Sequence, residues 1–285
     1  MFLPNGVSIR EMTEDDIGSG LALCRASRWN QTEQDWRFFL TAAPHGARVA
    51  EENGRVIGTV ATFPYGPFTW ISMVLVDPAA RGRQVGTALL QRGLELVGAD
   101  AIARLDATPS GEPIYSKLGF AAEYRLARWF LDVKRSPIAR RSSARPLARA
   151  DWPAICEMDQ RAFGASRTGL LQRLADEAPE YARVISRGVN VQGYLFGRHG
   201  HNREHLGPLV ADSADTAAAL LESSLSEQPD CRFYLDVPDD RQAWRAALSR
   251  TGFAIERPFL RMHRGPLTTP GQPSSIFAIA GPEFG

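Results

Sequence analysis

The sequence predicts an α/β (α+β) protein with two similar units in tandem, each a mixed, twisted sheet flanked by helices. One observation is a strand, a basic glycine-bearing loop and a helix in residues 74–97. Another is that the order of predicted elements in the first 133 residues recurs from Arg145 onward. The third is size, because 285 residues of 44% hydrophobic composition are enough for two compact cores.

The elements of the first unit follow from periodicity and turn signals. Thr13 precedes acidic residues and is expected to cap a helix. Asn53-Gly54 signals a type I′ hairpin, and Gly119 is expected to end a helix that carries Tyr115. The expected order is strand 7–10, a helix from 13, helix 32–40, strands 47–51 and 55–63, strand 68–76, helix 85–97, strand 101–107, a helix from 108, and strands in 120–133 that close the unit.

The most informative stretch is the connection between strand 71–76 and helix 85–97. It reads R-G-R-Q-V-G-T and leads directly into the helix start, where backbone N–H groups lack partners and the helix dipole is positive. Gly82 and Gly86 would let phosphate oxygens approach the backbone, while Arg81 and Arg83 add charge. The stretch therefore predicts a site for a diphosphate, although a plain strand-to-helix connection with solvated arginines is the alternative.

The second half repeats the first but differs at this connection. Residues 191–196, 209–210, 234–236 and 251–253 echo residues 56–61, 75–76, 104–106 and 118–120. The equivalent loop, A-D-S-A-D-T-A-A, has no glycine or arginine, and its two aspartates would repel a diphosphate. Leu248 stands where the first half has Tyr115. If the repeat is more than chance matching of short α/β patterns, the second unit lacks its own anion site.

The runs L-V-D-P-A-A-R-G-R-Q-V-G-T-A-L-L and I-Y-S-K-L-G-F resemble the GNAT superfamily of N-acetyltransferases, in its tandem two-domain form. The resemblance implies that the loop binds the pyrophosphate and pantetheine of acetyl-CoA, and that Tyr115 is the acid that protonates the departing thiolate. Gln84 stands where the family usually has its first motif glycine, and a register shifted by two residues, Arg83-x-x-Gly86-x-Ala88, restores the pattern. Tyr115 could instead be a core tyrosine.

The resemblance implies a cofactor-binding set at the strand end, the loop and the helix start, with acetyl-CoA as acyl donor and no metal. The implied set is Val74, Leu75, Val76, Arg81, Gly82, Arg83, Gln84, Val85, Gly86 and Thr87.

Residues for the acyl acceptor are expected nearby. Trp29 and Asn30 lie in the helix–helix connection that lines the acceptor side in the family, and Trp70 and Ser72 precede the cofactor segment. Trp29 could equally be half-buried in an ordinary loop, and Trp70 could be a core residue. No glutamate occupies residues 68–76, where many family members carry a base, so an ordered water or Asp106 is the expected substitute.

These observations give a domain and function prediction. Residues 1–133 form a GNAT domain that binds acetyl-CoA, 134–145 a linker, and 146–285 a GNAT-like domain without its own cofactor site. The expected activity is direct transfer of an acetyl or other acyl group from acetyl-CoA to a primary amine of a small-molecule acceptor. A non-catalytic acyl-CoA sensor is the alternative, followed by a purely structural or partner-binding protein.

Composition limits the partners and the compartment. With Lys+Arg 33 against Asp+Glu 32, the net charge of +1 gives no case for nucleic acid or an anionic membrane. No apolar run could span a membrane and no signal peptide is evident, so a cytoplasmic protein is expected, and a homodimer stays open as an alternative to a monomer. Cys24, Cys156 and Cys231 are expected to be small buried hydrophobes.

Three features of the second half remain open at this stage. His199-x-His201-x3-His205 has metal-like spacing but no acidic or cysteine partner in matching order, so a metal site is not expected. The cluster from Asp159 to Arg167 either shapes the acceptor pocket or forms structural salt bridges. The apolar pentamer 276–280 is expected to dock on a sheet edge.

Overall fold

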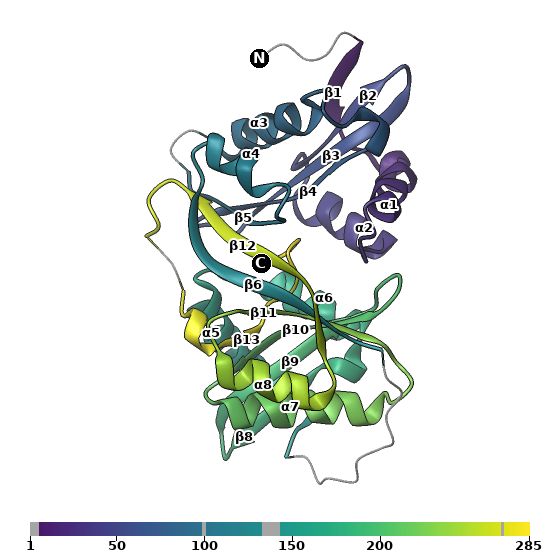
Figure 1. Ribbon diagram of the computed structural model, residues 1–285. Coiled ribbons are helices and arrows are strands. Elements are labelled where there is room, and N and C mark those ends of the chain that lie inside the picture. Colours follow the sequence, from purple (N-terminus) through teal and green to yellow (C-terminus); the bar gives the residue numbers. More distant parts are fainter. Residues whose placement is uncertain (1–5, 99–100, 133–142, 269–270) are drawn as a thin grey trace.

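The computed structural model describes residues 6–98, 101–132, 143–268 and 271–285. Within them, one 13-stranded sheet runs through the molecule in the order β1-β2-β3-β4-β5-β12-β6-β11-β10-β9-β8-β7, with β13 paired to β10. Figure 1 shows the two ends of this sheet in separate lobes, joined by the long crossing strands β6 and β12. The predicted α/β class and mixed sheet are confirmed.

The first half contains the predicted elements in the predicted order. Asn53 and Gly54 both have positive φ, as a type I′ turn requires, Thr13 caps the short helix before α1, and Thr32 caps α2. The elements are β1 Val7–Glu11, η1 Glu14–Asp16, α1 Ile17–Ala26, α2 Glu33–Ala42, β2 Ala47–Glu52, β3 Arg55–Pro64, β4 Thr69–Val76, η2 Pro78–Ala80, α3 Val85–Val97, β5 Ala103–Ala107, α4 Glu112–Lys117 and β6 Ala121–Leu131.

The second half repeats this order element by element. Its elements are β7 Arg145–Pro146, η3 Arg149–Asp151, α5 Trp152–Phe163, α6 Thr168–Glu177, η4 Pro179–Tyr181, β8 Arg183–Arg187, β9 Asn190–Arg198, β10 Glu204–Ala211, α7 Ala214–Glu227, β11 Phe233–Pro238, α8 Gln242–Thr251, β12 Ala254–Arg264, η5 Pro273–Ser275 and β13 Ile276–Ala278. Most of the predicted linker, residues 133–142, lies outside the described residues, and Arg145, expected at its end, already begins β7.

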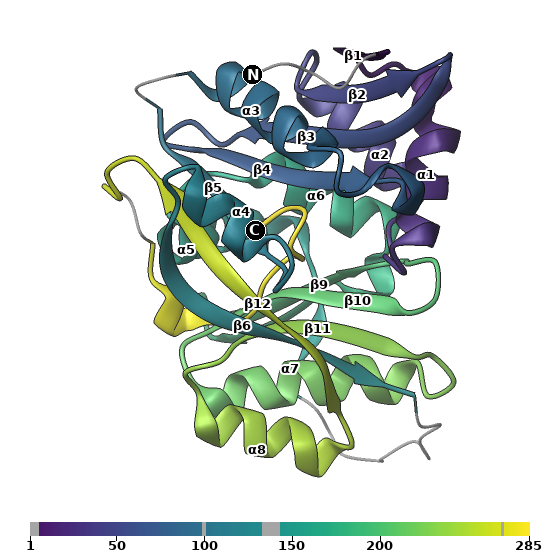
Figure 2. The same cartoon turned by 45° about the horizontal axis from the view of Figure 1, so that its top comes forward.

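The two halves exchange their last long strands. β6 of the first half pairs with β11 and β12, whereas β12 of the second half pairs with β5 and β6. The expectation that residues 120–133 close the first unit is therefore wrong, because β12 takes that place beside β5. Figure 2 shows β12 and β6 side by side across the middle of the molecule. Neither half has a complete sheet without a strand from the other.

Matching buried ion pairs fix this exchange. Arg261 on β12 donates from Nε and Nη2 to both oxygens of Asp106 on β5, at 2.8 and 2.9 Å. At the equivalent position, Arg128 on β6 donates to both oxygens of Asp236 on β11, at 2.8 and 2.7 Å. Both pairs are fully buried and bidentate. Because two parallel hydrogen bonds restrict orientation as well as distance, each pair fixes how its two strands lie relative to each other. The repeated geometry supports a repeated unit rather than a chance match.

The helices divide between the outside and the centre. α3 packs on β2, β3 and β4 with Val85, Leu89 and Leu90 fully buried, as the helical spacing predicts. On the other face, α1, α2, α5 and α6 share one apolar core that also includes residues of the C-terminal tail. Arg173 of α6 and Asp35 of α2 form an ion pair at 3.0 Å across this centre. The interface between the halves is therefore a continuous hydrophobic core.

Two pairs of neighbouring strands diverge within the sheet. β4 and β5 are paired only at Thr69 and Trp70, and β10 and β11 only at Glu204 and His205. In the second half, β13 enters the gap and pairs with β10 at Leu209 and Val210. The predicted docking of the apolar pentamer on a strand edge is confirmed, but that edge lies inside the sheet. The gap between β4 and β5 has no such strand.

We predict that Arg261→Ala lowers the free energy of unfolding by about 3–5 kcal/mol, because it leaves the Asp106 carboxylate buried without its partner. Denaturant unfolding followed by circular dichroism measures the change. Arg37→Ala, which removes exposed ion pairs with Glu14 and Glu33, is the control and should change stability far less, because water screens exposed charges. Equal losses in both variants would contradict this role of the strand exchange.

Candidate active site

A groove of about 800 Å³ opens where β4 separates from β5. Its walls come from the end of α1, the end of β4, the loop before α3, and the segment from Thr108 to Tyr115. Nine of the ten residues predicted to bind the cofactor line this groove. They are Val74, Leu75, Val76, Arg81, Gly82, Gln84, Val85, Gly86 and Thr87.

The loop that enters α3 has the backbone shape of an anion site. Gly82 has φ +78°, and Gln84, the N-cap of α3, has a left-handed φ of 64°. This conformation turns the chain so that the free N–H groups of the first turn of α3 face the groove. The conformation at Gln84 is one that glycine adopts more easily, in agreement with the glycine usual there in the family.

Arg83 is the exception among the predicted cofactor residues. Its guanidinium forms an ion pair with Glu52 of β2, and its side chain does not line the groove. The Glu52 carboxylate raises the pKa of Arg83, so this charge is committed to the edge of the sheet. Arg81 is left as the arginine of the loop whose side chain lies in the groove, with Nε 3.3 Å from the Val76 carbonyl oxygen.

A bulge in β4 aims the end of the strand into the groove. Met73 has a positive φ of 53°, and its register with β3 shifts between Thr59 and Ala61. The Thr59 hydroxyl donates a hydrogen bond of 2.7 Å to the Met73 carbonyl and holds the bulge in place. Beyond Trp70, no strand among the described residues pairs with the edge of β4 that faces β5, so this edge can accommodate an extended ligand.

Tyr115 lies at the inner end of the groove. It projects from α4 and lines both the groove and a second cavity behind it. Gly111 leaves room for its ring, because a Cβ there would come within 2.8 Å of Tyr115 Cε2. Burial raises the pKa of Tyr115 to about 12, so the hydroxyl keeps its proton at neutral pH and can donate a hydrogen bond.

The second cavity, here named the inner cavity, has a volume of about 50 Å³ and adjoins the groove. Trp29, Val74, Thr108, Tyr115 and Arg257 line both spaces. The inner cavity is built from β4 and β5 of the first half, β12 of the second half, and Pro282 and Glu283 of the tail. It exists only because the last strands are exchanged and the tail returns to the centre.

Two of the four predicted acceptor residues line these cavities. Trp29 lines both, and Asp106 lines the inner cavity. Asp106 is a poor base, because both of its oxygens accept hydrogen bonds from Arg261. Ser72, which was also considered, lines the inner cavity.

The other two predicted acceptor residues have structural roles. Trp70 is fully buried and donates from Nε1 to the Pro282 carbonyl at 2.9 Å. Asn30 is buried, donates to the Arg203 carbonyl at 2.8 Å, and accepts from the Asn202 N–H at 2.9 Å. Neither residue lines the groove or the inner cavity.

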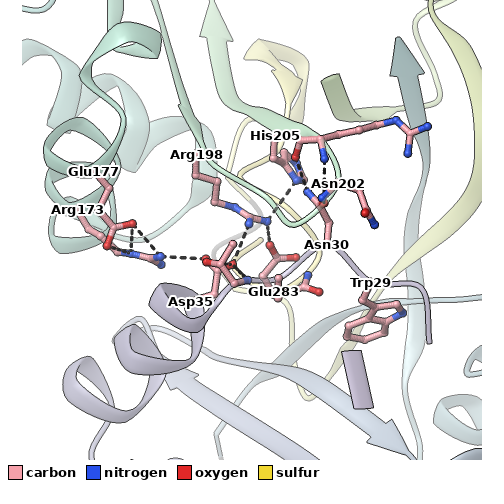
Figure 3. A network of polar contacts seen from close by, with 12 residues as sticks. Trp29, Asn30, Asp35, Arg173, Glu177, Arg198, Asn202, His205 and Glu283 are labelled. Atoms are coloured by element: carbon pink, nitrogen blue, oxygen red, sulfur yellow. Dashed lines mark hydrogen bonds and ion pairs between the residues drawn. The ribbon is translucent and has the colours of Figure 1, made fainter. Parts of the chain in front are cut away.

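A buried polar network joins the halves beside the inner cavity (Figure 3). Asp35 of α2 binds Arg173 at 3.0 Å and Arg198 at 3.1 Å, and Arg198 also pairs with Glu283. Burial and the neighbouring Arg198 lower the pKa of His205 to about 4, so the imidazole is neutral at pH 7. The network holds Glu283 at the cavity wall.

Sequence reasoning missed Glu283 and Arg257. Glu283 sits in a short G-P-E-F-G tail outside any motif, and Arg257 lies on a strand assigned to the other unit. The only available signal was the apolar pentamer at 276–280, which indicated that the tail returns to the body of the protein.

The equivalent site of the second half is closed. Ser213 Oγ caps α7 by accepting a hydrogen bond of 3.2 Å from the Thr216 N–H, and Leu248 is buried at the position of Tyr115. β13 fills the gap between β10 and β11, and the Ile279 N–H donates to the Asp236 carbonyl at 2.9 Å. The tail thus makes with these strands the contacts that an extended ligand would need.

The remaining candidates of the second half are structural. Arg167 and Asp159 form a fully buried ion pair at 2.9 Å, and Arg167 Nη1 donates to the Gly285 carbonyl. His199 is partly exposed beside Glu204, whereas His205 is buried beside Asp236. Across the described ranges, no group of three or more His, Cys, Asp or Glu residues is placed to hold a metal ion. The three cysteines are free thiols.

The described residues form two halves with the same order of helices and strands, and β4 and β5 diverge beside the start of α3. The acetyltransferase (GNAT) family model matches residues 13–120, and an acetyltransferase (GNAT) domain model matches residues 155–278. The chain therefore belongs to the GNAT acetyltransferases and contains two GNAT domains in tandem.

Individual relatives agree with this assignment. An uncharacterized N-acetyltransferase, YitH, from Bacillus subtilis is 24% identical over 250 residues, covering 85% of this chain and 86% of YitH. The L-2,4-diaminobutyric acid acetyltransferase of Nocardia farcinica is 33% identical over 108 residues, covering 36% of this chain and 56% of that protein. The crystal structure of a putative acetyltransferase from Pyrococcus horikoshii superposes with a TM-score of 0.84 at 24% identity, covering 100% of this chain and 98% of that one. In the part of the chain that the structure describes, no helix is long and apolar enough to cross a membrane.

We predict that Tyr115→Phe lowers kcat by about 100-fold and leaves the affinity for CoA unchanged, because only the hydroxyl near the leaving group is lost. Because the pKa of Tyr115 is about 12, its ionisation should reduce activity only above about pH 11. Any change of kcat with pH between pH 6 and 10 should therefore be the same in Tyr115→Phe as in the wild-type protein. Steady-state kinetics against pH and calorimetry with CoA measure these quantities, and an unchanged kcat would exclude Tyr115 as the proton donor.

Proposed function

We propose that this protein is an N-acetyltransferase that moves the acetyl group of acetyl-CoA directly to a primary amine of a small molecule. The observation that carries the proposal is the groove between β4 and β5, which combines unpaired strand backbone with the free N–H groups at the start of α3. The relative from Nocardia farcinica is named for a small primary amine, L-2,4-diaminobutyric acid, which supports an acceptor of this size.

The residues of the groove have distinct roles in this proposal. The N–H groups in the first turn of α3 and the Arg81 guanidinium bind the diphosphate, and the backbone of Val74 and Val76 aligns the pantetheine. A backbone N–H at the end of β4 stabilises the charge that develops on the thioester oxygen. The small volume and the burial of the inner cavity keep bulk water from the thioester.

The chemical step forms an N–C bond and breaks the C–S bond. The amine nitrogen attacks the thioester carbon, and the departing sulfur receives a hydrogen bond from the Tyr115 hydroxyl. With the pKa of Tyr115 at about 12 and that of a thiol near 8.5, full proton transfer from Tyr115 alone is unfavourable. The hydroxyl therefore acts as a relay that donates to sulfur while it receives the proton that the nitrogen loses.

We also propose that the first domain binds acetyl-CoA and that the second has no donor site. The two aspartates of the A-D-S-A-D-T loop, the Ser213 cap of α7 and the presence of β13 in the gap support this assignment. The domain limits 1–133 and 146–285 follow the sequence repeat, although each domain completes the sheet of the other. The second domain contributes β12 and the tail to the active site.

We predict that one CoA molecule binds per chain in isothermal titration calorimetry. Arg81→Ala should weaken binding by about tenfold through loss of a charge-assisted contact with the diphosphate. Gly86→Glu should weaken it further, because its Cβ would lie 3.3 Å from Val76 Cγ2 and its carboxylate would face the phosphates. Arg92→Ala, on the exposed side of α3, is the matched control and should bind normally.

The activity itself is tested by thiol release from acetyl-CoA with a panel of small primary amines. Acetyl-CoA turnover that depends on the amine is the expected result. Binding of two CoA molecules per chain would contradict the single donor site, and tight CoA binding without turnover of any amine would contradict the proposed activity.

A further inference from the structure

Four buried polar atoms without a hydrogen-bond partner line the inner cavity. They are Gln31 Oε1, Ser72 Oγ, Arg257 Nε and Glu283 Oε2. Gln31, Ser72 and Glu283 are only 3%, 7% and 2% exposed. Buried polar atoms in folded proteins are almost always paired, so a cluster of unpaired ones around one cavity indicates a ligand that would pair them.

The structure holds one oxygen of Glu283 and leaves the other open. Arg198 binds Oε1, and Phe284 stacks on Phe39 at 5.2 Å, which anchors the tail on α2. Gly281 leaves space for the carboxylate, because a Cβ there would lie 2.8 Å from Oε1 and 3.0 Å from Oε2. Figure 3 shows Glu283 beside Asp35, with its carboxylate pointing toward Arg198. Oε2 is therefore a fixed acceptor at the cavity wall.

Three of the four unpaired atoms can accept hydrogen bonds. Gln31 Oε1, Ser72 Oγ and Glu283 Oε2 match in number the three N–H donors of a primary ammonium group. Glu283 also supplies the negative charge that an ammonium group requires in a buried site. A secondary or tertiary amine would leave at least one of these atoms unpaired.

The fourth atom belongs to a cation that is not neutralised. Arg257 stacks over Phe259 at 5.1 Å, and within the described ranges it has no carboxylate within ion-pair distance. Its neighbours on the central strands, Arg128 and Arg261, each have one. Burial and the neighbouring Arg128 lower the pKa of Arg257, and the more distant carboxylates of Asp236 and Glu256 offset this only in part. An anionic group at the boundary of the inner cavity and the groove would form an ion pair with Arg257 and stabilise its buried positive charge.

We infer that the acceptor is a small zwitterion whose primary amine binds Gln31, Ser72 and Glu283, and whose anionic group, such as a carboxylate, binds Arg257. The inference rests on the proposed function and narrows its substrate class from amines to amines that carry an acid group. The cavity volume of about 50 Å³ admits only the amine end, so the rest of the acceptor extends toward Arg257 and the groove.

Glu283 also supplies the base that the anchor strand lacks. The bound ammonium gives one proton to Oε2, which leaves a neutral amine and a protonated Glu283. The nitrogen then bonds to the thioester carbon, the C–S bond breaks, and the second proton passes through Tyr115 to the sulfur. Glu283 finally releases its proton to water, so that ammonium and thioester yield amide, thiol and one proton.

The substrate class is tested with pairs of acceptors that differ by one carboxylate. Suitable pairs are glycine with methylamine, alanine with ethylamine, and 4-aminobutyrate with propylamine. We expect at least one acid to have a kcat/KM at least tenfold above that of its amine. Arg257→Gln should remove this preference by raising KM for the acid about 10- to 100-fold, with little change for the amine. Arg257→Lys is the matched control and should retain part of the preference.

Two results would overturn the role of Arg257. One is equal kcat/KM for acids and amines in the wild-type protein. The other is a loss of CoA affinity in Arg257→Gln with an unchanged acid-to-amine ratio, which would place this residue in donor binding. If no amine is acetylated, the proposed function fails by itself. Calorimetry of the same acids and amines with the CoA-bound protein then tests the inference. We expect the acids to bind and the amines not to bind, and we expect Arg257→Gln to abolish binding of the acids.

Glu283 is tested by Glu283→Gln, with Ser72→Ala as a milder variant that preserves the ion pair with Arg198. Glu283→Gln should lower kcat at least 100-fold, whereas Ser72→Ala should mainly raise KM. Both variants should bind CoA normally, which verifies that they fold. A Glu283→Gln enzyme with unchanged kcat would exclude Glu283 as base.

Discussion

The exchange of β6 and β12 between the halves is the constraint on which the rest of the structure depends. Two bidentate ion pairs, Asp106 with Arg261 and Asp236 with Arg128, lock the exchanged strands at equivalent positions. Because these pairs are fully buried, either partner alone would be an uncompensated charge, and the strands cannot slip without that cost. The exchange brings Arg257 of the second half beside Tyr115 of the first, so the inner cavity is a product of both halves.

The tail shows how the second half contributes without a donor site of its own. Its strand β13 lies in the gap between β10 and β11, and the residues that follow cross to the first half. There the Tyr65 hydroxyl and the Trp70 indole donate to carbonyls of the tail at 2.8 and 2.9 Å. The segment that closes one gap therefore also delivers Glu283 to the wall of the inner cavity beside the other gap.

Much of the fold and of the donor side could be predicted because its signals are local. The hairpin at Asn53-Gly54, the helical spacing from Val85 and the glycines before α3 each act within a few residues. The acceptor side depends on contacts between distant residues. Strand 121–131 could pair with β5 or with β11. The two halves have the same pattern of residues, so the sequence does not distinguish these pairings. The contacts of Asn30 and Trp70 could not be predicted for the same reason, since their partners Arg203 and Pro282 lie in the other half.

Each strand of the first half has an equivalent in the second, and equivalent strands lie at equal distances from the centre of the sheet, where β12 and β6 pair. This is the arrangement of a symmetric dimer of single domains that have swapped their terminal strands. Here both copies belong to one polypeptide, so the partner is always present at a ratio of one to one. In a non-covalent dimer, dilution would separate the subunits and disrupt a site built from both. In a single polypeptide this dissociation cannot occur, and each copy can evolve a different role.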